Sequence, residues 1–102
     1  MPNRDEQRDD INAKRKELKN EHEDFMESSR RFRNQEVEAL QYYWRNDKRM
    51  TVLIAQLTEA IHEDEKQAER FFEQQDYELT SELKLLDKLD EQDEQDLHDA
   101  TS

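Results

Sequence analysis

Two series of apolar residues divide the chain into two halves, and both series follow helical spacing. The first series recurs every seven residues and consists of Ile11, Leu18, Phe25, Phe32 and Ala39. The second runs at spacings of three, four or seven and consists of Met50, Ile54, Leu57, Ile61, Ala68, Phe72, Leu79, Leu83 and Leu86. Such spacing places apolar side chains along one stripe of a helix that pairs with another helix. The pattern therefore predicts an all-α protein.

The segment between the two series carries residues that end and begin helices. Asn46 and Asp47 lie there, just after Trp44. Asn and Asp side chains accept hydrogen bonds at a helix start, and Asn tolerates the left-handed conformation that often ends a helix. We place a turn at about Trp44–Asp47, with one helix over about 5–43 and a second over about 48–89. A short link between long helices predicts an antiparallel, coiled-coil-like two-helix hairpin, and one continuous helical rod is the alternative.

The position of the turn also predicts which residues face each other. In an antiparallel hairpin that turns near residue 46, the numbers of facing residues add to about 93. Phe25 then faces Ala68, and Phe32 faces Ile61, so these residues are expected on the seam between the helices. The second series changes phase after residue 68. We therefore expect a local irregularity at residues 72–79.

Apolar residues outside the predicted seam indicate a surface for a partner. At about 100° per residue, they form one strip beside the seam on each helix. The candidate partner-binding residues are Met26, Val37, Leu40, Trp44, Leu53, Phe71 and Leu85. A two-helix pair encloses no core, so we expect it to be loosely held until it packs against another protein. The alternative is that these residues widen the seam or are ordinary surface residues.

Composition excludes several classes of function. The 102 residues include no Gly and no Cys, which excludes Gly-rich phosphate loops, nucleophile elbows, disulfides and thiolate metal sites. Glu59-x-x-His62 has metal-ligand spacing, but neither His22 nor His98 supplies the second motif that a di-iron site needs. We expect no catalytic residue, no cofactor and no metal. The sequence has no apolar run that could span a membrane and no secretory signal, which favours a cytoplasmic protein without membrane insertion.

Charge is distributed unevenly along the chain, whose net charge is −12. Residues 1–46 carry 10 basic and 11 acidic side chains, whereas residues 47–102 carry 6 basic and 17 acidic ones. We therefore divide the chain into a hairpin over 1–89 and an acidic tail over 90–102 that frays or is disordered. Binding to nucleic acid is not expected, because phosphate contacts need a basic surface. For the one basic cluster, Arg30, Arg31 and Arg33, we expect ion pairs.

A helical hairpin of this length with a Trp at its turn resembles the WXG-type small proteins of type VII secretion. The matching residues are Trp44-Arg45-Asn46, with Asn where that family has Gly. The charged, Gly-free chain and its acidic, Leu-rich segment at 82–93 resemble the small helical partners of LXG-domain toxins in Gram-positive bacteria.

The resemblance implies a targeting factor or chaperone. Such a protein binds the helical N-terminal domain of an LXG toxin, often beside a second small partner, and directs it to the secretion machine. The resemblance leaves open whether the protein is itself exported. Phe72-Glu-Gln-Gln-Asp76 matches the Phe-x-x-x-Asp export motif of related partners, but Phe72 is better explained as a seam residue. Tyr43-x-x-x-Asp47 is similar to a secretion signal but lies at the turn.

Two other functions fit the same sequence. One is a homo-oligomeric structural coiled coil, which would use the apolar strips on itself. The other is an acidic mimic of DNA that inhibits a nucleic-acid-binding protein, as the acidic second half suggests.

Overall fold

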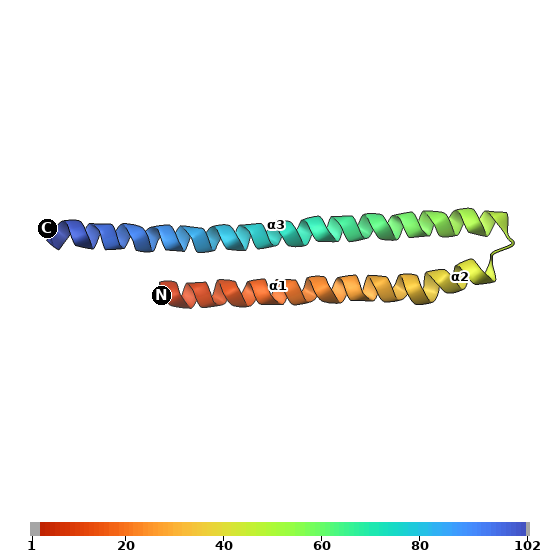
Figure 1. The fold of residues 1–102 in the computed structure, drawn as a ribbon, viewed down its shortest axis with the longest axis horizontal. Helices are drawn as coiled ribbons and strands as arrows, with labels where there is room; N and C mark the ends of the chain where they lie inside the picture. Colours follow the sequence, from red (N-terminus) through yellow and green to blue (C-terminus); the bar gives the residue numbers. More distant parts are fainter. Residues whose placement is uncertain (1–2, 102) are drawn as a thin grey trace. The chain divides into compact units, whose positions relative to one another are not determined.

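The computed structural model describes residues 3–101, and helices account for almost all of them. Helix α1 spans Arg4–Phe32, the π-helix η1 spans Arg33–Val37, α2 spans Glu38–Tyr43 and α3 spans Lys48–Thr101 (Figure 1). No strand occurs within the described residues, which confirms the all-α prediction. The chain forms two compact units. Unit 1 comprises Met1–Leu18 with Glu73–Ser102, and unit 2 comprises Lys19–Phe72.

Polar side chains define the first turn of α1 and of α3. The Oδ1 atom of Asn3 accepts a hydrogen bond from the backbone N–H of Glu6 at 2.8 Å. In the same way, Oδ1 of Asp47 accepts a hydrogen bond from the N–H of Met50 at 3.0 Å. These bonds satisfy N–H groups that lack a partner within the helix, so each helix begins directly after its capping residue.

Residues 44–47 separate α2 from α3 where the sequence predicts the turn. The N–H of Trp44 donates to the carbonyl of Leu40 at 2.9 Å, and the N–H of Asp47 donates to the carbonyl of Trp44 at 3.0 Å. No residue of the described chain has a positive φ. Asn46 therefore does not use the left-handed conformation considered from the sequence. The segment between the helices is therefore a hydrogen-bonded bend without a left-handed residue.

In unit 2 the segments before and after the turn pair in antiparallel fashion. The rings of His22 and Phe72 stack with centroids 4.7 Å apart, and Ser29 is hydrogen-bonded to Glu65. In both pairs the residue numbers add to 94, close to the register that the sequence predicts. The seam of unit 2 is the line of less exposed residues between these segments. Its members on the first segment are His22, Met26, Ser29, Arg33, Val37, Leu40 and Trp44.

This seam differs by one position from the predicted one on the first segment. Phe25, Phe32 and Ala39 are exposed, so their predicted seam positions are wrong, whereas Ile54, Ile61 and Ala68 lie on the seam as predicted. In a straight α-helix, residues seven apart drift by about 20° per heptad. Over several heptads this drift carries a seven-residue series off the contact line. The residues that replace it are separated by steps of four, three, four, four, three and four, which average close to the 3.6 residues of an α-helical turn.

The break in helical regularity occurs in the first segment and not at residues 72–79. Helix α3 runs without interruption from Lys48 to Thr101. The π-helix lies at Arg33–Val37, where the backbone N–H of Glu38 bonds to the carbonyl of Arg33. Because a π-turn takes up one more residue than an α-turn, it brings Val37 onto the seam. The predicted irregularity at 72–79 is therefore wrong.

Unit 1 is also an antiparallel pair, formed by the start of α1 and the later part of α3. Arg4 pairs with Asp90 at 2.9 Å, and Arg15 pairs with Asp76 at 2.9 Å. Ile11 is the buried hydrophobic residue of this unit. The sequence predicts a helix end near residue 89, but α3 continues to Thr101. Half of residues 90–101 are strong helix formers, and Asp90 has arginine partners that offset its unfavourable charge.

Candidate interaction surface

A polar cluster interrupts the apolar seam of unit 2. Glu65 of α3 is buried, and its Oε1 atom accepts a hydrogen bond from the hydroxyl of Ser29 at 2.5 Å. The same oxygen lies 3.0 Å from Nε of Arg33, the first residue of the π-helix. Nδ1 of His62 lies 3.8 Å from the other carboxylate oxygen. The cluster joins both segments of unit 2 through one carboxylate.

A buried carboxylate is costly unless a cation and hydrogen bonds compensate it, and Arg33 and Ser29 provide both. The Glu65 carboxylate is compensated only when the two segments of unit 2 are aligned so that Ser29 and Arg33 contact it. The cluster therefore favours this register over a register shifted along the helices. Sequence reasoning missed Glu65 because it is charged. Its position between Ile61 and Ala68, at steps of four and three, was the available signal.

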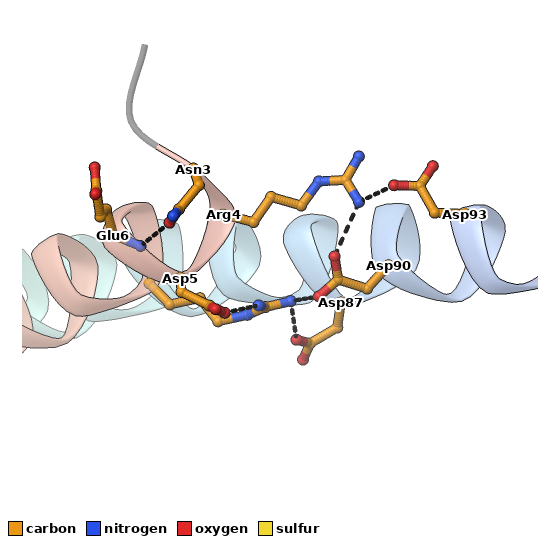
Figure 2. Close-up of polar contacts among 8 residues, drawn as sticks. Asn3, Arg4, Asp5, Glu6, Asp87, Asp90 and Asp93 are labelled. Atoms are coloured by element: carbon orange, nitrogen blue, oxygen red, sulfur yellow. Dashed lines mark hydrogen bonds and ion pairs between the residues drawn. The ribbon is translucent and has the colours of Figure 1, made fainter.

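Unit 1 is held at one end by a cluster of ion pairs, drawn in Figure 2. Arg4 contacts both Asp90 and Asp93, and Arg8 contacts Asp87 at 3.3 Å as well as Asp90. Hydrogen bonds from Arg8 and Arg4 lower the pKa of the Asp90 carboxyl, and the same bonds raise the pKa of both guanidinium groups. These groups are partly exposed, so the cluster orients the helix ends more than it stabilises them.

The sequence did not predict this cluster, because residues 90–102 were interpreted as a solvated tail. Its signal is the match of two arginines four residues apart with acids spaced by three on the later helix. For the basic cluster at Arg30–Arg33, the expected ion pairs are present at two positions. Arg31 pairs with Glu27 at 3.0 Å, and Arg33 pairs with Glu65.

The predicted partner-binding strip on the first helix lies on the seam of unit 2. Val37 is buried, and Met26, Leu40 and Trp44 are half-buried on the seam of unit 2. A role in binding a partner stays a prediction for these four residues, which pack within unit 2. The cause of this packing is the same shift of register that exposes Phe25 and Phe32.

The predicted strip on the second helix is exposed. Leu53 and Phe71 of unit 2 and Leu85 of unit 1 each keep more than half of their surface accessible. An edge-to-face contact holds the ring of Phe71 against Phe72, with centroids 5.4 Å apart. The accessible apolar residues of unit 2 include Phe25 and Phe32, which the sequence places on the seam, and Leu53 and Phe71, which it places on a strip.

The residues of the two candidate export motifs all make contacts within the chain. Phe72 is half-buried against His22, and Asp76 pairs with Arg15. Tyr43 is exposed and packs edge-on against Trp44, while Asp47 caps α3. These contacts give Phe72, Asp76 and Asp47 structural roles within the chain.

No three His, Cys, Asp or Glu side chains among residues 3–101 are arranged so that they could hold a metal ion. No helix in this range has the length and apolar character needed to cross a bilayer. No protein-family model, curated protein or solved structure matches the chain.

Proposed function

We propose that this protein is a non-catalytic helical partner that binds the helical N-terminal domain of an LXG-type toxin and helps to target it for type VII secretion. In this proposal the chain works as an antiparallel, coiled-coil-like hairpin. It acts in the cytoplasm, together with a second small helical partner where the toxin requires one.

The observation that carries the proposal is the shortage of internal packing. Among the described residues, the buried hydrophobic ones are Ile11, Val37 and Ile54, whereas Phe25, Phe32, Leu53, Phe71 and Leu85 are exposed. Two paired helices cannot cover both of their broad faces, and a partner that adds further helices removes this apolar surface from water. A helical toxin domain supplies such helices.

The resemblance of the sequence to small type VII partners supplies the class of partner. The Trp at the turn, the length of the chain and its acidic character support that assignment. The export motif at Phe72 and Asp76 belongs to the same proposal, and its outward availability depends on release of the contacts with His22 and Arg15.

Co-purification from the native genetic neighbourhood tests the proposal. The tagged chain, expressed together with its neighbouring genes, should retain a long protein with a helical N-terminal domain. The homo-oligomeric coiled coil would retain only itself. The acidic mimic of DNA would retain a basic nucleic-acid-binding protein, and salt would release it. Either of these two results would overturn the proposal.

A further inference from the structure

Four large apolar residues of unit 2 form what we call the aromatic face: Phe25, Phe32, Leu53 and Phe71. Their side chains are between 37% and 56% exposed. Three of them are Phe, a residue with a large apolar surface and no polar group to bind water. Single exposed apolar residues are ordinary, so the arrangement of the four decides whether they form a site.

The hydrogen bond between Ser29 and Glu65 marks the seam and fixes where the four residues lie around each helix. At about 100° per residue, Phe25 and Phe32 lie about 40–60° from Ser29, both in the negative sense. Leu53 and Phe71 are eighteen residues apart, which is five full turns, and both lie about 120° from Glu65 in the negative sense.

Because the segments are antiparallel, rotation in the same sense on both leads to the same broad face of unit 2. The four residues therefore share one face, which continues between the two helices. Val52, the other exposed aliphatic residue near this region, lies on the opposite side of α3. The four residues thus gather on one broad face of unit 2, as a docking surface requires.

The polar surroundings of the aromatic face are acidic. Glu21 and Asp24 on α1 and Asp64 on α3 lie about 80–140° from the seam on the same side. None of these three carboxylates forms an ion pair with another described residue. The cations on this side are Arg31, which is already paired with Glu27, and Arg49, which lies about 160° from Glu65 in the same sense, so the three carboxylates outnumber the remaining cation. A helix that covers the face thus meets unpaired negative charge at its edges.

This charge selects between two kinds of occupant. A second copy of the chain would bring the same acids to the face and a net charge of −12 to the complex. A helix with basic residues beside its apolar stripe would bring complementary charge instead.

We propose that the aromatic face binds an amphipathic helix of another protein, and that Lys or Arg residues flank the apolar stripe of this helix. The inference rests on the proposed partner role. The face extends at least from Leu53 to Phe71, which is about 27 Å of helix at 1.5 Å per residue. The bound helix therefore needs about eighteen residues. Apolar contact supplies most of the affinity, and the acidic edges supply selectivity and rapid association.

Designed peptides provide the probe. A 21-residue helical peptide with Leu at heptad positions a and d and Lys at e and g is titrated into the full chain by calorimetry. A second peptide carries Glu at e and g, and a third keeps Lys but has Ser at a and d. We expect the first peptide to bind at least tenfold more tightly than the other two.

Variants locate the binding site. Phe71→Ser and Leu53→Ser should each weaken binding of the basic peptide about tenfold. Tyr77→Ser is the matched control, because Tyr77 is an exposed aromatic residue of the same helix outside the face, and it should leave binding unchanged. Circular dichroism of each variant verifies that it is folded.

Several results would overturn the inference. They are equal affinity for the Glu peptide, equal affinity for the Ser peptide, and unchanged binding by both face variants. A dimer in sedimentation that Phe71→Ser dissociates would assign the face to a second copy.

Failure of the proposed function looks different, because the peptide results would hold while no toxin co-purifies. If the toxin co-purifies equally well with Phe71→Ser, the face is wrong and the partner role stands.

Discussion

Truncation of the two valines of the chain tests the register of unit 2. Val37 is 4% exposed and Val52 is 56% exposed, and both lie on helical segments of the same unit. Val37→Ala and Val52→Ala are therefore the same chemical change in two environments. The sequence places Val37 on an exposed strip, where both changes would have the same effect.

The structure predicts a clear difference in the free energy of unfolding. Each change removes two methyl groups, and a buried methyl contributes about 0.8 kcal/mol. At Val37 nearly all of the stabilisation from the two methyl groups is lost, and a residual cavity lowers the free energy of unfolding further. Both changes also gain up to about 0.7 kcal/mol of helix propensity. We expect Val37→Ala to cost about 1–2 kcal/mol and Val52→Ala to remain within about 0.5 kcal/mol of the parent.

Urea denaturation measures both values, followed by circular dichroism and by the fluorescence of Trp44, which reports on unit 2. With a urea dependence of about 1–3 kcal/mol per molar, the midpoint of Val37→Ala should fall by about 0.3 M or more. Equal midpoints for the two variants, or a lower one for Val52→Ala, would refute the seam that contains Val37.

Three further changes address the polar contacts. A nuclear magnetic resonance titration should give the Asp90 carboxyl a pKa below its ordinary 3.8, and Arg8→Ala should return the pKa towards that value. Because folding lowers this pKa, the ionised carboxyl stabilises the folded chain above pH 3.8, and this stabilisation is lost as the pH falls below 3.8 and through the lowered pKa. A normal pKa in the parent chain would contradict the ion pairs. Glu65→Leu should cost about 1–3 kcal/mol in urea denaturation because it leaves the Arg33 guanidinium without its carboxylate. Adding Arg33→Leu should restore most of that loss, and a double variant as unstable as the single one would show that the pair is not coupled. Asp47→Ala should cost about 1 kcal/mol through loss of the cap of α3, and an unchanged urea midpoint would show that the cap contributes nothing.

Local signals were sufficient for the helices and for the place where one helix ends and the next begins. The spacing of apolar residues indicated helix throughout, and Asp47 begins α3 as its capping chemistry predicts. These features depend on residues within a few positions of one another. The facing register of unit 2 was also predictable, since the position of a short turn determines it.

The rotation of the first segment about its own axis was not predictable from a seven-residue series. Phe25 and Phe32 keep that spacing, but a helix of 3.6 residues per turn carries them off the contact line. The π-helix at Arg33–Val37 then shifts the line again. Small errors in angle add up along a long helix, so the series pointed to the wrong neighbours.

The sequence by itself thus determined the helical class, the helix starts and the acidic character of this protein, because each follows from composition or from short-range spacing. Only the tertiary structure decided which apolar residues are buried. In the pairing with α3, Val37 is buried on the seam and Phe32 remains exposed. Glu65 is buried although it is charged, because Ser29 donates a hydrogen bond to its carboxylate and Arg33 forms an ion pair with it. The candidate binding surface is a consequence of that choice, since the phenylalanines excluded from the seam are the ones left for a partner.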